Sequence, residues 1–136
     1  MSQKNVEIVR QLMALGEQVR YSGQPLPHTD LVTPDAEIDL SRRVFNPEIY
    51  RGYEGLARLN AELQEVWTEW RVTPERLLDA GDCVVSIETV RGRGRGSGLE
   101  MEARYASIWT LANGQVTRVE VGLDPAEALK AVGLEG

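Results

Sequence analysis

Hydrophobic residues near the beginning of the chain recur every three or four positions. Three of them, Val6, Val9 and Met13, share one face with Gly16 at this spacing. This period is typical of an amphipathic helix, and it predicts one from about Gln3 to Arg20. Prolines at positions 25 and 27 then exclude a helix and predict an irregular connector. Over residues 36–40 apolar and acidic residues alternate instead, which predicts a short strand.

A second apolar stripe with helical spacing follows a polar loop. Its members are Leu56, Leu59, Leu63, Val66 and Trp70. The stripe predicts a helix from about Glu54 to Trp70, with Trp67 at its edge. Four runs of strand-forming residues come next, at 76–79, 83–90, 99–111 and 116–123. After them, Asp124 is a typical N-cap and Gly133 a typical stop for a short closing helix.

Helices set apart from sequential strands with short turns are typical of an α+β domain with an antiparallel meander. A chain of 136 residues, 42% apolar and 26% charged, suits one globular domain over residues 1–136. The net charge of −6 argues against nucleic acid and anionic membrane as partners, because phosphate binding needs a basic surface. No apolar run approaches the roughly 18 residues that span a bilayer.

Cysteine and histidine each occur once. Cys83 cannot form an internal disulfide, and with His28 alone no zinc cluster can be built. The first ten residues carry charges where an export signal needs an apolar core. We therefore expect a cytoplasmic protein without a metal or another cofactor.

The last two predicted strands must be joined so that their apolar faces match. A two-residue turn at 113–114 would place Trp109 opposite Arg118. A three-residue loop over 112–114 keeps the charges together, because it places Trp109 opposite Thr117 and Ser107 opposite Val119. We therefore expect the longer loop, with a glycine at positive φ in position 114.

The same alternation predicts which side chains form the inner wall of the sheet. They are Val85, Ile87, Thr89, Met101, Ala103, Tyr105, Ser107, Trp109, Val119, Val121 and Leu123. The expected wall is apolar with three hydroxyl groups, and it contains no carboxylate, imidazole or lysine.

Four segments carry a resemblance to known proteins: YRGYEGLARL, DAGDCVV, GRGRGSG and WTLANGQVTRVEV. With the order of the elements, they resemble the superfamily named after nuclear transport factor 2, and within it the SnoaL-like and ketosteroid-isomerase-like proteins. The resemblance implies a cystatin-like α+β roll, in which a cone-shaped, curved antiparallel sheet and N-terminal helices enclose an apolar pocket. This fold hosts isomerases, dehydratases, cyclases, epoxide hydrolases and binding modules.

The resemblance also shows where this superfamily keeps its acid–base groups. The isomerases use a tyrosine, a general base and an oxyanion-stabilising acid, and these fall at Leu12, Leu40 and Ser107. The cyclase aspartate falls at Val121, and the hydrolase arginine and aspartate fall at Thr89 and Arg91. Every one of these positions is altered. Since proton abstraction needs a base within hydrogen-bond reach, isomerisation and epoxide hydrolysis by those routes are disfavoured.

Asp39, next to the altered base position, is the candidate catalytic residue. One hypothesis makes it a general base at the mouth of the pocket, with its pKa raised by apolar neighbours. The other makes it an outward strand residue paired with Arg42 or Arg43, which strand alternation favours.

The candidate ligand-binding residues combine apolar surface with a few polar groups, the usual make-up of a small-molecule site. They are Thr89, Arg91, Tyr105, Ser107, Trp109, Val121 and Trp67. The aromatic members can equally be core packing. The run over 91–98, with three arginines between glycines, does not match a dinucleotide fingerprint because it lies between two strands. We expect a flexible hairpin loop there, or alternatively a lip that attracts anions.

These observations lead to a small-molecule site of the SnoaL-like type, in an isomerase, dehydratase or cyclase-like enzyme acting on an apolar compound. The alternative is a non-catalytic ligand-binding or dimerisation module, since the superfamily's acids are missing. A homodimer through the outer sheet face is also expected. There charged residues at 100, 102, 104, 118 and 120 surround Ala106 and Ile108.

Overall fold

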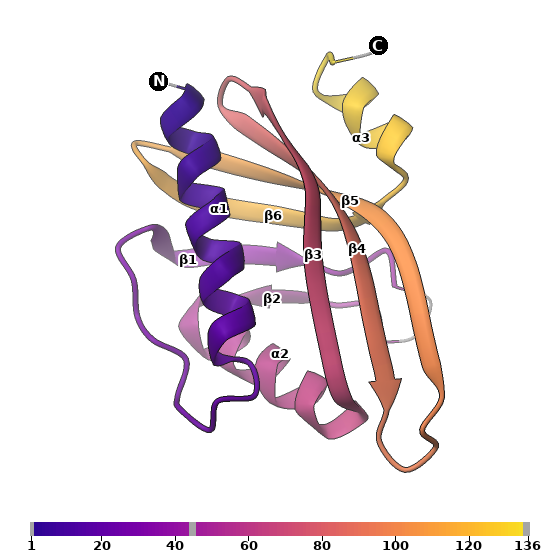
Figure 1. Cartoon of the computed structure of the whole chain (residues 1–136). Helices are drawn as coiled ribbons and strands as arrows, with labels where there is room; N and C mark the ends of the chain where they lie inside the picture. Colours follow the sequence, from indigo (N-terminus) through magenta and orange to yellow (C-terminus); the bar gives the residue numbers. More distant parts are fainter. Residues whose placement is uncertain (1, 44–45, 135–136) are drawn as a thin grey trace.

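The computed structural model describes residues 2–43 and 46–134, and these form three helices and six strands (Figure 1). In chain order the elements are α1 (Ser2–Val19), β1 (Val32–Asp39), β2 (Ile49–Arg51), α2 (Gly52–Val66), β3 (Trp67–Ala80), β4 (Cys83–Gly94), β5 (Glu100–Ala112), β6 (Gln115–Leu123) and α3 (Pro125–Ala131). Over the described residues, none of these helices is long and apolar enough to cross a membrane.

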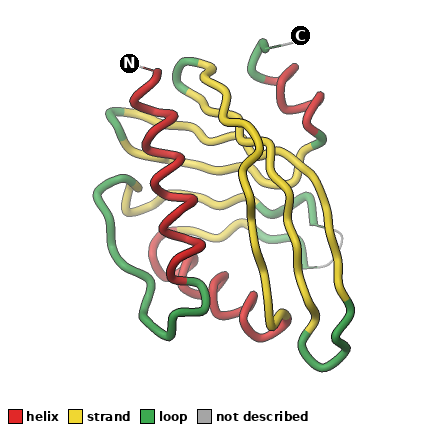
Figure 2. The backbone as a smooth tube through the Cα atoms, viewed as in Figure 1, coloured by secondary structure: helices red, strands yellow, loops and turns green. Residues whose placement is uncertain are grey.

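One curved, unclosed sheet organises the molecule, with strand order β2-β1-β6-β5-β4-β3 (Figure 2). The predicted α+β roll is confirmed, and β3 to β6 form the predicted antiparallel meander. The sheet as a whole is mixed, because β1 pairs with β6 in parallel. The chain makes β2, α2 and three strands of the meander between these two, so it returns to β1 running in the same direction.

Two apolar clusters lie on opposite faces of the sheet. On the inner face, α1 packs Val6 and Val9 against Val84, Val119 and their neighbours. On the outer face, α3 packs against Val85, Ile87, Ala106, Ile108 and Leu123. The Asp124 carboxylate accepts hydrogen bonds from two backbone N–H groups of α3, as its predicted role of N-cap requires.

The second helix is shorter than its stripe predicts. It ends at Val66, whose side chain is 57% exposed, and Trp67 and Trp70 belong to β3. The reason is tertiary: this stretch pairs with β4 through Trp70 opposite Gly92 and Val72 opposite Val90. Inter-strand pairing therefore overrides a helical spacing in the local sequence.

The turn between β5 and β6 differs from the expected three-residue loop. Asn113 and Gly114 form a two-residue turn, both at positive φ, as hairpin turns of this length require. A bulge at Thr117 then shifts the pairing, so that Trp109 lies opposite Val119. The extra residue that matches the two apolar faces thus lies in the strand instead of the loop, and Ser107 lies opposite Val121.

The expected inner wall is wrong for β4. Tyr105 and Ser107 pair directly with Glu88 and Ser86, so these residues share the inner face. Val85, Ile87 and Thr89 point to the outer face instead. Residues 84–88 are all buried, since both faces of β4 are covered. In such a strand the hydrophobic pattern no longer distinguishes the two faces. Leu123 also lies in the outer cluster, after a second irregularity at Gly122.

Candidate functional site

A carboxylate lies buried in the middle of the inner face, where none was expected. Glu88 is 4% exposed. Its Oε1 accepts a hydrogen bond of 2.7 Å from the Ser107 hydroxyl, and its Oε2 accepts one of 3.2 Å from the Ser86 hydroxyl. The indole N–H of Trp109 donates to Ser86 Oγ over 2.9 Å. We call Glu88, Ser86, Ser107 and Trp109 the Glu88 cluster.

Strand pairing alone brings the Glu88 cluster together. Ser86 and Glu88 are two residues apart on β4, so they project from the same face. Ser107 of β5 lies directly opposite Ser86, and Tyr105 directly opposite Glu88. The cluster therefore spans two rigid neighbouring strands and depends on no loop.

The electrostatics of Glu88 suit proton transfer near neutral pH. Burial raises its pKa to about 7, although the hydroxyl groups of Ser107 and Ser86 act in the opposite direction. Burial, and next the charge of Glu88, also raise the pKa of Tyr105, while Arg20, which directly follows α1, lowers it. Glu88 can thus accept or donate a proton at neutral pH, and Tyr105 stays a neutral hydroxyl.

The inner face around the Glu88 cluster is aromatic. The rings of Trp67 and Trp70 lie 5.1 Å apart at 44° and both contact β4 at Gly92. Gly92 lies opposite Met101 on β5 and is buried. The apolar stripe of α2 at residues 56, 59 and 63 is only half-buried and belongs to neither buried cluster. Among the described residues, the buried cluster on the inner face therefore includes residues of α1 and none of α2.

Five of the predicted site residues lie on the inner face: Tyr105, Ser107, Trp109, Val121 and Trp67. Thr89 and Arg91 do not. Thr89 donates to Glu75 on the outer face over 2.5 Å, and Arg91 forms an ion pair with Glu102. The inner face expected for Thr89 and Arg91 is therefore wrong. The reason is the one given for β4, whose hydrophobic pattern does not distinguish its two faces.

Asp39 lies on the outer face, away from the Glu88 cluster. It is 7% exposed and forms an ion pair with Arg118, and Ser41 N–H donates to its Oδ1 over 2.9 Å. Burial raises the pKa of Asp39, but the hydrogen bonds from Ser41 and the Arg118 guanidinium outweigh burial and lower it. The geometry favours the ion-pair hypothesis over the general base. The partner, however, comes from β6 and is neither Arg42 nor Arg43.

The arginines between glycines have structural partners. Arg91 and Arg93 lie on β4 and pair with Glu102 and Glu100 of β5. The Arg95 guanidinium donates to the carbonyl of Gln64 over 2.7 Å, where it satisfies the C-terminal end of α2. The hairpin loop is correspondingly shorter than expected, because β4 continues to Gly94.

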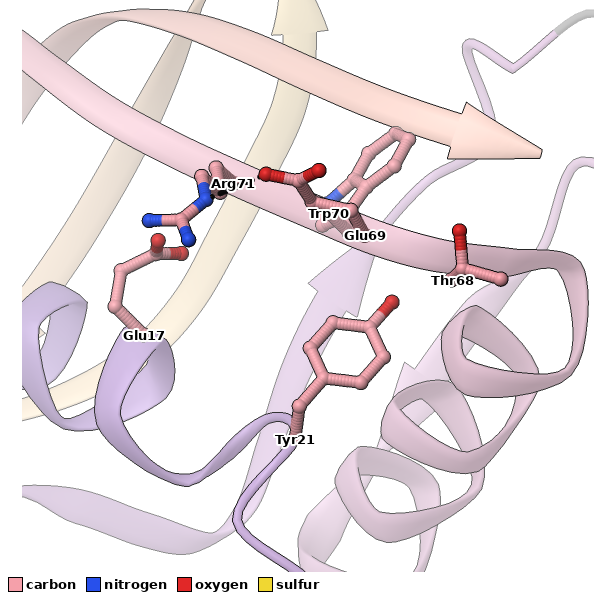
Figure 3. Close-up of a pocket in the computed structure, with 6 residues that line it drawn as sticks. All are labelled: Glu17, Tyr21, Thr68, Glu69, Trp70 and Arg71. Atoms are coloured by element: carbon pink, nitrogen blue, oxygen red, sulfur yellow. Dashed lines mark hydrogen bonds and ion pairs between the residues drawn. The ribbon is translucent and has the colours of Figure 1, made fainter. Parts of the chain in front are cut away.

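A surface pocket of about 390 Å³ lies where the end of α1 meets the free edge of β3. Figure 3 shows the six residues that line it. Here side chains of α1 and of the two residues that follow it bind backbone groups of that edge. Tyr21 donates to the Trp67 carbonyl over 2.8 Å, Arg20 donates to the Trp70 carbonyl over 2.9 Å, and Glu17 accepts from Val72 N–H. These bonds shield an edge strand that would otherwise invite pairing with another chain. The pocket does not reach the Glu88 cluster.

A second pocket, of about 490 Å³, lies around the ends of β3, β4 and β5, among Glu69, Arg91, Arg93 and Glu102. It too has no lining residue from the Glu88 cluster. The apolar pocket expected beside Tyr105 therefore stays a prediction.

Glu88 was missed, although the sequence contains a signal for it. Residues 83–90 read CVVSIETV, with apolar residues at both parities. Such a run is typical of a strand covered on both faces, so a carboxylate inside it must be buried. Which face Glu88 takes cannot be read from that run, but its burial can.

Comparison with protein-family models gives one match, to the SnoaL-like domain, over residues 23–119. The chain belongs to the SnoaL-like family. Comparison with curated protein sequences gives no match. The family assignment confirms the resemblance inferred from the four sequence segments.

Solved structures show that this SnoaL-like domain shares its fold with several proteins. A nuclear transport factor 2-like protein of unknown function from Burkholderia pseudomallei is 18% identical with a TM-score of 0.72, and the match covers 97% of this chain and 98% of that one. A protein described as a SnoaL-like polyketide cyclase from Jannaschia sp. CCS1 is 22% identical with a TM-score of 0.70, over 100% and 96% of the chains. A protein with a ketosteroid-isomerase-like fold from Catenulispora acidiphila, in complex with trimethylamine, is 17% identical with a TM-score of 0.70, over 94% and 93%.

Proposed function

We propose that this SnoaL-like domain binds an apolar small molecule against the inner face of the sheet and transfers a proton on it through Glu88. The activity would be that of an isomerase, dehydratase or cyclase-like enzyme. The observation that carries the proposal is the burial of a carboxylate without a cationic partner among the described residues, on the inner face, with two hydroxyl donors. Such a group destabilises a fold and is typical of functional sites.

The roles of the neighbouring residues follow from their chemistry. Ionised Glu88 would remove a proton from a carbon next to a carbonyl group and return it to another atom of the same compound. Tyr105, opposite Glu88, makes no hydrogen bond to any described residue, and its hydroxyl is available to donate to the carbonyl oxygen. Trp67, Trp109 and Val121 would contact the apolar part of the ligand.

Hydrogen exchange of 2-tetralone in D₂O tests this function, because the compound is an apolar ketone with exchangeable α-hydrogens. We expect the protein to accelerate deuterium incorporation, followed by NMR, with an inflection near pH 7. Glu88→Gln should lower the rate about 100-fold, the lower end of what a general base contributes. Asp39→Asn, a carboxylate of the outer face, should leave the rate unchanged.

The same experiment distinguishes the alternative function. Saturation-transfer NMR reports whether 2-tetralone binds at all. Binding without accelerated exchange would favour a non-catalytic ligand-binding module. Neither binding nor exchange, or an exchange rate equal in the Glu88→Gln variant, would contradict the enzyme proposal.

The proposal retains a cytoplasmic homodimer that forms through the outer sheet face. The expected apolar centre of that interface is corrected, because Ala106 and Ile108 are covered by α3. Exposed ion pairs across β3, β4 and β5 support such an interface. Among them, Arg91 pairs with Glu102, and Arg104 pairs with Glu75. Alternating charges of this kind can be complementary to a second copy.

Sedimentation velocity tests the homodimer. We expect a dimer at 50 mM salt that dissociates as salt screens the charges, and a monomer in a Glu102→Arg variant. Glu7→Arg, on the solvent side of α1, is the matched control and should leave the dimer intact. A wild-type chain that remains monomeric at low salt would contradict the interface.

A further inference from the structure

The Glu88 cluster contains a side chain that does not touch the carboxylate but controls the hydroxyl that does. Ser86 Oγ has a single proton to donate. Trp109 Nε1 can only donate, and it points its proton at Ser86 Oγ over 2.9 Å. The hydrogen bond from Trp109 therefore occupies one lone pair of Ser86 Oγ. Among the described residues, the acceptor of the Ser86 proton is Glu88 Oε2, at 3.2 Å.

We propose that Trp109 is a positioning residue, whose indole N–H aligns the Ser86 hydroxyl so that it donates to Glu88. The inference rests on the proposed function for its purpose, which is to tune the group that transfers the proton. Its geometry is independent of that function. Ser107, the other donor to Glu88, is buried and receives no such hydrogen bond from the described residues, so it serves as an internal comparison.

The alignment favours the ionised carboxylate. A hydroxyl that accepts a hydrogen bond becomes a stronger donor, because chains of hydrogen bonds polarise one another. Without the Trp109 donor, the Ser86 hydroxyl is free to rotate and accept a hydrogen bond from the carboxyl group of neutral Glu88. The charged groups facing the cluster do not replace this effect. Tyr105 of β5 stays neutral, and Arg20, which follows α1, is already bonded to Glu17 and to the Trp70 carbonyl.

The test measures the pKa of Glu88 directly, from the carboxyl ¹³C resonance of protein labelled in glutamate and titrated over pH 5–9. The resonance is assigned by its loss in Glu88→Gln. Removing a hydrogen bond to a charged group should raise the pKa, by about one unit in Ser86→Ala and about half a unit in Trp109→Phe. Trp70→Phe, which removes an inner-face indole that is not bonded to Ser86, should leave the pKa unchanged.

Double variants decide whether Trp109 acts through Ser86. In Ser86→Ala/Trp109→Phe the pKa should equal that of Ser86→Ala alone, whereas in Ser107→Ala/Trp109→Phe the two shifts should add. Additive shifts in the first pair, or no shift in Trp109→Phe, would overturn the proposal.

Trp109 also packs against the inner cluster, so Trp109→Phe can disturb the fold. Replacing Trp109 by 3-benzothienylalanine keeps the ring shape and removes only the N–H donor, and it should raise the pKa as much as phenylalanine does. The titration needs no substrate, so its outcome is separate from that of 2-tetralone exchange. If the double variants show the expected pKa shifts but 2-tetralone does not exchange, the enzyme proposal is refuted and the positioning role of Trp109 still holds.

Discussion

Replacing Glu88 by glutamine is expected to make the folded protein more stable at pH 8. The pKa of this buried carboxyl is about 7 in the fold, against 4.5 in the unfolded chain. Between these values the folded state holds a proton that the unfolded state has lost. The free energy of unfolding therefore falls as pH rises from 4.5 through 7. The difference between the two pKa values corresponds to a total loss of roughly 3 kcal/mol.

Glutamine keeps the shape of the side chain but does not ionise, so it removes this pH-dependent loss. We expect the free energy of unfolding of Glu88→Gln to exceed that of the wild type at pH 8 by about 1–3 kcal/mol, with no gain at pH 4. Urea titrations followed by tryptophan fluorescence at pH 4, 6 and 8 measure the difference.

Asp39→Asn is the matched control, with the opposite sign. The pKa of Asp39 is lowered in the fold, so its ionised form stabilises the protein above the unfolded pKa, and that contribution is lost as pH falls. The variant should be less stable than the wild type at pH 8, and the deficit should shrink towards pH 3. A Glu88→Gln variant that loses stability equally at every pH would contradict the assignment of Glu88 as a destabilising carboxylate.

Replacing Gly92 by alanine is expected to destabilise the protein by about 1–3 kcal/mol through overpacking. A Cβ at this position would lie 2.9 Å from Cε3 of Trp70 and 3.0 Å from Cε3 of Trp67. These atoms belong to rigid rings that have only two side-chain torsions, so relief requires a shift of both rings or of the backbone. Urea unfolding measures the loss, and near-ultraviolet circular dichroism reports the rearranged indoles.

Gly16→Ala provides the control for Gly92→Ala. Gly16 lies in α1, where a Cβ would meet only the end of Arg20 at 3.7 Å. Alanine is the better helix former, so this variant should gain roughly 0.5–1 kcal/mol. Equal effects of the two substitutions would mean that the Trp67 and Trp70 rings yield without cost.

The Gly92 contact also explains why the sequence was misleading at Trp67 and Trp70. Their spacing continues the stripe of α2, so a helix through Trp70 is locally consistent. In the fold both rings lie against Gly92 of β4, a position without a side chain, and Arg95 satisfies the end of the helix. The residues that make this arrangement favourable, Gly92 and Arg95, come at least 22 positions later in the chain, beyond the reach of any local pattern.

Local patterns were sufficient to predict the helix α1, the capped helix α3 and the antiparallel meander, because each depends on periodicity, capping or turn residues that act over a few positions. Positive φ at Gly114 followed in the same way. The family was inferred from the resemblance of four segments to known proteins. Which residues of β4 face α1, in contrast, depends on how the strands pair in the folded molecule. A strand buried on both sides has apolar residues at both parities, so no polar alternation records its orientation. Pairing with β5 resolves this and places Glu88 beside Ser86, Ser107 and Tyr105.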